Sequence, residues 1–206
     1  MRKYFLDLMG WFQNYISILV LTGFAISIAQ AENMPCADNV AAHLWVSPRQ
    51  PDARAPVRLM TVSTSHALSE ITIFDREGNR IPLQSSRRGG PPWRIQTALG
   101  QLEAGRYQVE IHSDGNRIAC HTLVIGKSHT QPAMNEWNQA TEAFYAAWIE
   151  ELFAAPFPES LSFPSLEPLL RNAEHNFLHD YLGLNEDAAL PLTPDCADLP
   201  YTLRSY

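Results

Sequence analysis

Short runs in which hydrophobic and polar residues alternate fill the chain from residue 40 to residue 125. A period of two places successive side chains on opposite faces of a β-strand. The runs that predict strands are residues 44–46, 57–62, 71–74, 81–83, 93–97, 106–111 and 117–125. Ser113-Asp114-Gly115-Asn116 predicts a tight hairpin, because Asp-Gly accepts the positive φ angles of such turns. This series of short antiparallel strands predicts an immunoglobulin-like β-sandwich.

Near residue 128 the period changes to three or four residues, which is typical of α-helices. The first predicted helix has Thr130 as its cap and Pro132 in its first turn, and it ends before Pro156. Its apolar stripe is Met134, Trp137, Thr141, Phe144, Trp148 and Leu152. After a connector rich in Pro and Phe, a second helix is predicted from Ser165 to Gly183, and a third element begins near Asp195. We therefore predict an α+β protein with a sandwich over residues 32–127 and a helical segment over residues 128–206.

Residues 1–31 have the order of a secretory signal peptide. Two basic residues are followed by an apolar stretch from Ile16 to Ile28 and by Ala29-Gln30-Ala31, so cleavage is expected before Glu32. The alternative is an uncleaved membrane anchor, but polar residues interrupt the apolar region, and a span needs about 20 mostly apolar residues. We expect an exported protein of the periplasm or cell envelope, with membrane contact only through this segment.

The charge of the exported part excludes some classes of partner. Residues 32–206 carry 13 basic and 21 acidic side chains, and no basic cluster larger than Arg87-Arg88 stands out. This balance argues against nucleic-acid binding and against attraction to an anionic membrane surface.

The three cysteines leave one thiol over. Cys36 and Cys120 bracket the predicted sandwich, and we pair them in an oxidising compartment. Such a bridge stabilises the fold by roughly 4–5 kcal/mol in the chain-entropy model. The alternatives pair Cys196 with Cys36 or with Cys120, and either would consume the remaining thiol.

Cys196 is the candidate nucleophile. It lies at the predicted start of the third helical element, where unpaired N–H groups and the helix dipole favour a negatively charged sulfur. Pro200 supports this placement, because proline is tolerated in a first turn but not deep inside a helix. We expect the carboxylate of Asp198 to point away from the sulfur.

The twelve residues from Asp195 to Tyr206 resemble the nucleophile helix of papain-like cysteine enzymes. Transglutaminase-like bacterial cysteine proteases often show Asp-Cys-x-Asp before an apolar helix, which Asp195, Cys196 and Asp198 match. NlpC-type cell-wall peptidases show Asp-Cys-Ser-Gly, from which Ala197 and Asp198 depart. The resemblance implies that residues 128–206 are the start of a papain-like domain.

The resemblance also implies a function and its limit. Cys196 would be the nucleophile of a hydrolase of amide bonds in peptidoglycan or protein, and Asp198 a supporting residue. In both families the general-base histidine follows the cysteine in the chain, whereas no residue after Cys196 is His, Asn or Gln. We therefore expect an N-terminal fragment with an incomplete hydrolase domain, inactive by itself.

Two histidines offer alternatives upstream. His175 and His179 are four residues apart on the second predicted helix, so they would share one face. They could act as a base for Cys196, hold zinc together with Glu174 or Asp180, or be ordinary surface histidines, which is the interpretation we favour. We expect no cofactor and no metal. The alternative function is a non-catalytic envelope protein whose sandwich binds a partner or a glycan.

Overall fold

The computed structural model describes residues 36, 41–126, 137–154, 165–188, 190 and 192–206. The predicted signal peptide, the predicted helix start at Thr130 and Pro132, and the connector over residues 156–164 lie outside the described residues. Among the described residues, no helix has both the length and the apolar character that a membrane span requires.

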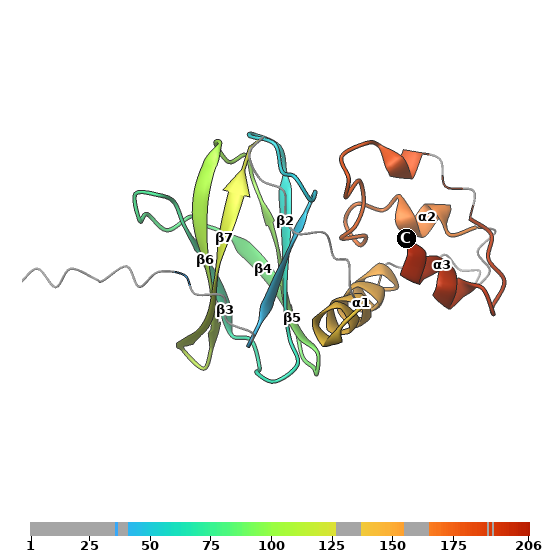
Figure 1. The fold of residues 1–206 in the computed structure, drawn as a ribbon, viewed down its shortest axis with the longest axis horizontal. Coiled ribbons are helices and arrows are strands. Elements are labelled where there is room, and N and C mark those ends of the chain that lie inside the picture. The colour runs from blue at the N-terminus through green and yellow to red at the C-terminus, as the bar shows by residue number, and fades with distance from the viewer. Residues whose placement is uncertain (1–35, 37–40, 127–136, 155–164, 189, 191) are drawn as a thin grey trace, which may run out of the picture. The chain divides into compact units, whose positions relative to one another are not determined.

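Two antiparallel sheets face each other across an apolar core (Figure 1). One sheet has the order β1-β2-β5-β4 and the other β3-β6-β7. The strands are β1 (His43–Ser47), β2 (Val57–Ser63), β3 (Glu70–Phe74), β4 (Gln84–Arg88), β5 (Trp93–Leu99), β6 (Gly105–Ser113) and β7 (Asn116–Ile125). This distribution of strands is the constant-type immunoglobulin arrangement. The predicted antiparallel sandwich and the α+β class are confirmed.

The hairpin between β6 and β7 lies where the sequence predicts it. Ser113 pairs with Asn116, and the two residues between them have φ angles of 49° (Asp114) and 79° (Gly115). Positive φ at both central positions is the requirement that Asp-Gly satisfies.

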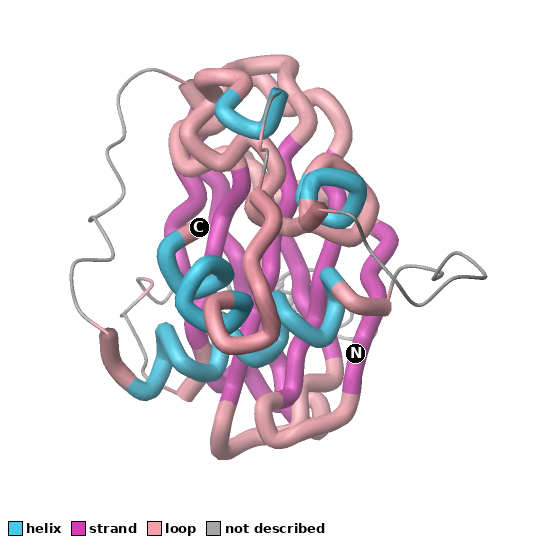
Figure 2. Tube along the Cα trace, turned by 90° about the vertical axis from the view of Figure 1, so that its right-hand side faces the viewer, coloured by secondary structure: helices cyan, strands magenta, loops and turns pink. Residues whose placement is uncertain are grey.

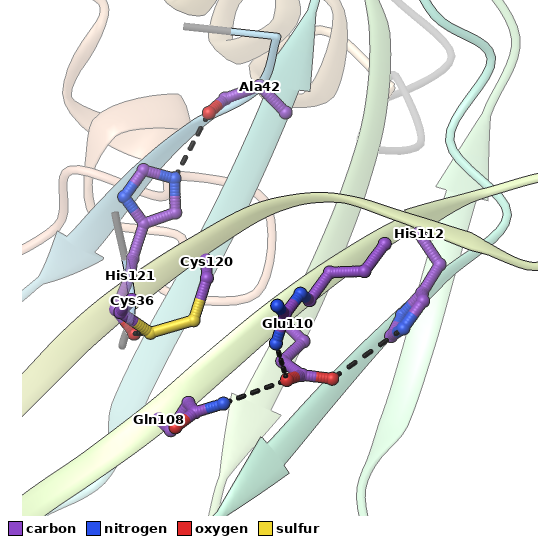
Figure 3. The surroundings of a disulfide bond; sticks show 8 residues. Cys36, Ala42, Gln108, Glu110, His112, Cys120 and His121 are labelled. Carbon is purple, nitrogen blue, oxygen red and sulfur yellow. Dashed lines mark hydrogen bonds and ion pairs between the residues drawn. A yellow bond between two sulfur atoms is a disulfide. The ribbon is translucent and has the colours of Figure 1, made fainter. Parts of the chain in front are cut away.

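The predicted disulfide between Cys36 and Cys120 is present, with 5.0 Å between the two Cα atoms. Figure 3 shows it beside His121, whose Nε2 lies 3.0 Å from the carbonyl oxygen of Ala42. Because a carbonyl only accepts, this nitrogen carries the proton. The pairings that involve Cys196 are wrong, since its thiol is free.

The fourth strand differs from the prediction. The run 81–83 is not a strand; instead β4 follows it and contains Arg87 and Arg88. Pro82 removes a backbone donor from the predicted run. All five residues of β4 are exposed, so the strand has no apolar alternation that a pattern could detect.

A second apolar layer covers the outer face of the four-stranded sheet. Met60 and Val62 of β2 point outward with Trp45, and α1 (Gln139–Leu152) packs on them. Figure 2 shows helices in front of the strands. The ring of Phe144 stacks on Trp45 with 4.7 Å between centroids. The apolar face of the first helix is thus buried on the sheet.

The helix α1 is shorter than the predicted one. The helix begins after Asn138, whose Oδ1 accepts the backbone N–H of Thr141 at 3.0 Å, and Trp137 precedes the helix. Asparagine is among the preferred N-cap residues.

The second predicted helix is largely wrong. Only α2 (Glu167–Leu170) is helical, and turns follow it to Leu182. The side-chain oxygens of Asn172 and Asn176 accept the N–H groups of Glu174 (3.1 Å) and Leu178 (3.0 Å). Such local bonds compete with helical ones. The remaining helical elements are the 3₁₀ helix η1 (Glu186–Ala188) and α3 (Leu199–Ser205).

Candidate functional site

Cys196 lies in an exposed turn, residues 196–198, that leads directly into α3. Its thiol is free, because the other two cysteines are bonded to each other. The sequence predicted a helical element from about Asp195, whereas α3 begins at Leu199 and Cys196 lies in the turn before it.

Asp195 fixes the shape of this turn. Its Oδ1 accepts the backbone N–H groups of Ala197 at 2.8 Å and Asp198 at 2.9 Å. Its carbonyl oxygen accepts the N–H of Leu199 at 3.0 Å. Asp195 thus behaves as the cap of the whole turn, and Cys196 is the first residue inside it. The backbone N–H of Cys196 has no partner among the described residues.

Asp198, the predicted supporting residue, is exposed and makes no side-chain cap bond to α3. Its backbone oxygen accepts from the N–H and the hydroxyl of Thr202, at 2.9 and 3.0 Å. Sequence reasoning gave the capping role to neither aspartate. The signal was available, because Asp195 followed three residues later by an acidic residue resembles a helix start.

The two candidate histidines do not share a helical face. His175 and His179 lie in the turns after α2, where their N–H groups bond to residues three positions earlier. Nδ1 of His175 lies 3.8 Å from Oε1 of Glu151, which is too long for a hydrogen bond. Within the described parts of the chain, no hydrogen bond joins a histidine to Cys196, and no three His, Cys, Asp or Glu side chains cluster as metal ligands do.

A buried polar network holds α3, and therefore the Cys196 turn, against the rest of the molecule. The hydroxyl of Tyr206 donates to Asp187 and accepts from Nδ2 of Asn176 at 2.9 Å. Oδ1 of Asn176 accepts the indole N–H of Trp148 at 2.9 Å, and the Tyr206 ring stacks on Trp148. Burial, and then the bond to Asp187, raise the pKa of Tyr206 above its ordinary value.

Two arginines on the outer face of the four-stranded sheet contact the helical segment. Arg94 of β5 is 1% exposed and forms an ion pair with Glu151 of α1. Burial lowers the pKa of Arg94, while Glu151 and Glu150 oppose this effect. Arg58 of β2 donates to the carbonyl oxygens of Ala173 (3.2 Å), Asn176 (3.1 Å) and His179. The alternation of residues in the sequence predicts that both arginines lie on the outer face of the four-stranded sheet. It does not predict that helices cover this face.

A cleft of about 410 Å³ lies at the edge of the sandwich, between β3 and β4. Its lining residues are Glu70, Ile71, Arg80, Pro82, Leu83 and Ser85. Sequence reasoning did not select these residues. Pro82 was the available signal, because proline inside a strand-like run indicates the edge of a sheet.

Comparison with protein-family models finds no matching family, and comparison with curated proteins finds no matching relative. Among solved structures, the chain is similar to one described as the crystal structure of the Lin-41 filamin domain. The similarity covers 43% of this chain and 97% of that domain, with 11% identity and a TM-score of 0.31. At these values the similarity supports no inference about site or function, so the chemistry rests on the residues themselves.

Proposed function

We propose that this chain carries the nucleophile of an exported cysteine hydrolase that cleaves amide bonds in peptidoglycan or protein. One observation supports the proposal most directly. Cys196 has a free, exposed thiol in the turn that Asp195 caps just before α3, and its own N–H is unpartnered among the described residues. The disulfide between Cys36 and Cys120 fits an oxidising compartment.

The proposed reaction uses this turn in two ways. The Cys196 sulfur bonds to the carbonyl carbon of the amide, the C–N bond breaks, and the amine leaves with the proton that the thiol gave up. Water then attacks the thioester, which releases the acid and restores the thiol. In the proposed reaction the N–H of Cys196 donates to the oxyanion. What supports this role is that Asp195 accepts the next two N–H groups and leaves this one available.

The proton transfer needs a base, and the role of Asp198 is supporting only. No imidazole bonds to the Cys196 sulfur within the described residues, so the proposal names a nucleophile but no base for it. For this reason the test measures thiol chemistry rather than turnover.

The experiment compares the rate at which iodoacetamide labels the oxidised chain with the rate for N-acetylcysteine at pH 6. Only Cys196 is free, so the signal belongs to one residue, and Cys196→Ser is the blank. We expect labelling at least tenfold faster than that of the small thiol. A labelling rate that rises only near pH 8.5, the ordinary pKa of a thiol, would contradict the proposal.

A second candidate function is a non-catalytic envelope protein whose sandwich binds a partner. The specific observation in its favour is the cleft between β3 and β4, which lies on the sandwich rather than at the cysteine. On this proposal Cys196→Ser leaves partner binding unchanged and substitutions in the cleft abolish it.

A further inference from the structure

We propose that the free edge of β4 binds an extended, acidic segment of a partner protein, which adds a strand to the four-stranded sheet. The inference rests on the second candidate function, since Ser85 of β4 lines the cleft described above, and it names a class of partner. It does not depend on the chemistry of Cys196, so it can fail while the hydrolase proposal stands, and the reverse also holds.

The first observation is that β4 has a neighbouring strand on one side only. It is the last strand in the order β1-β2-β5-β4, and it pairs with β5 along its whole length. In an antiparallel pair, every second residue directs its N–H and C=O away from the neighbouring strand. Within the described residues, no other strand pairs with β4, and no backbone bond from outside the sheet reaches it. The outward groups of β4 are therefore available to pair with an added strand.

The second observation is that this edge is accessible. All five residues of β4 are exposed, and none of them is a proline, so each has a backbone donor. Pro82 before the strand and Pro91 after it have no N–H, so they limit the pairing edge to the strand itself. A partner strand would therefore pair along about 17 Å of extended backbone.

The third observation is that β4 carries two positive charges that no carboxylate meets. Arg87 and Arg88 are consecutive, so they lie on opposite faces of the strand. Nη1 of Arg87 donates to the carbonyl oxygen of Ser69 at 3.0 Å, which leaves its charge without a counter-charge. Arg88 lies opposite Arg94 of β5, and Glu151 pairs with Arg94. Within the part of the chain that the structure describes, neither Arg87 nor Arg88 forms an ion pair.

These charges select the occupant. Charged side chains on an edge strand discourage pairing with neutral or basic strands, whereas opposite charges on paired strands attract. A segment with two adjacent acidic residues places one carboxylate on each face, opposite Arg87 and Arg88. A second copy of this chain fits less well, because pairing of two β4 strands gathers four arginines and no carboxylate. The whole chain has a net charge of −7, so an acidic segment gains no general attraction and must bind through this local contact.

The test selects binders to the full oxidised chain from a phage-displayed library of random twelve-residue peptides, and fluorescence anisotropy then measures their affinity. We expect enriched sequences in which two adjacent Asp or Glu residues lie in a run of residues with high β propensity. Synthetic versions should bind about fivefold more weakly to Arg88→Glu. Replacing one acidic residue of the peptide by Lys should restore the affinity for this variant. Arg106→Glu, the same charge reversal at an exposed position of β6, is the matched control and should bind like the parent chain.

Amide hydrogen exchange on the same complex locates the added strand. We expect the peptide to slow exchange at alternate residues of β4, which are those whose N–H groups point away from β5. Unchanged exchange in the β6–β7 hairpin of each variant shows that the fold is retained. The inference is overturned if no acidic peptide is enriched, if Arg88→Glu binds as tightly as Arg106→Glu, or if the Lys-containing peptide restores nothing. It is also overturned if the peptide protects another strand edge, or if two copies of the free chain pair through β4.

Discussion

At the scale of single residues, the side chains of Asn176, Asp187, Trp148 and Tyr206 form one buried hydrogen-bonded network. Asn176 uses its side-chain oxygen for Trp148 and its side-chain nitrogen for Tyr206 and for the carbonyl of Leu170. The second oxygen of Asp187 accepts the N–H of Asp180 at 2.6 Å. Removing one member leaves the others buried without a partner, which costs more than the bond itself contributes.

Tyr206 gives a prediction with a defined pH range. Its raised pKa means that the folded chain keeps a proton that an unfolded tyrosine loses near pH 10. The stability from this group is fully present below that pH and is lost as the pH rises through the raised value. We expect Tyr206→Phe to reduce the fall in unfolding free energy above pH 10, as measured by urea titration at pH 8, 10 and 11. An equal fall in both proteins would contradict this role.

At the scale of elements, Arg58 and the turns after α2 form one unit. Three carbonyl groups, which a continuous helix would have bonded internally, accept from a single guanidinium. Burial lowers the pKa of Arg58, and the carboxylates of Asp180 and Asp187 oppose that effect together with Tyr206.

Arg58→Lys tests this unit. A lysine keeps the charge but has one ammonium group, which cannot reach the three carbonyls from two directions as a planar fork does. We expect a loss of about 1–3 kcal/mol of stability. We also expect faster amide exchange over residues 171–182, with the β6–β7 hairpin unaffected. Arg106→Lys, on an exposed position of β6, is the matched control and should change neither measurement.

The elements also show what the sequence could predict. Strands with one apolar face, such as β5 and β6, have the alternation that core packing requires, so pattern reading found them. β4 was missed because an exposed edge strand needs no apolar residue. The second helix was overpredicted because Leu166, Leu169 and Phe177 recur at helical spacing, yet asparagine side chains and Arg58 bond the backbone in turns.

For the candidate site, residues that are close in the sequence predict only the features that those same residues form. The position of Cys196 in a turn just before a helix follows from its neighbours Asp195, which caps the turn, and Pro200, which lies in the first turn of α3. The cleft joins β3 to β4 and to the segment between them, so it depends on how two sheets meet. The alternation of residues along one strand predicts neither the residues that line this cleft nor the burial of Arg94 under α1.

At the scale of the whole molecule, β2 of the four-stranded sheet has apolar residues on both of its faces. Val57 and Leu59 face the sandwich core, while Met60 and Val62 face α1. The helical segment is thus packed on the sandwich through Trp45, Phe144 and the Arg94–Glu151 pair.

The disulfide gives a prediction at this scale. The double substitution Cys36→Ser and Cys120→Ser frees a loop whose ends are 84 residues apart, and chain entropy then predicts a loss of roughly 4–5 kcal/mol. Urea unfolding measures it, and Cys196→Ser is the matched control that should leave the midpoint unchanged. A loss below about 1 kcal/mol would show that the bridge contributes little.

The same bond determines how the protein responds to tension. If residues 36 and 206 are pulled apart, the load enters at Cys36, crosses to Cys120 and continues along β7, so β1 to β6 are bypassed. The bypassed 84 residues correspond to about 290 Å of extended chain, which becomes available for stretching only after a reductant has cut the bond.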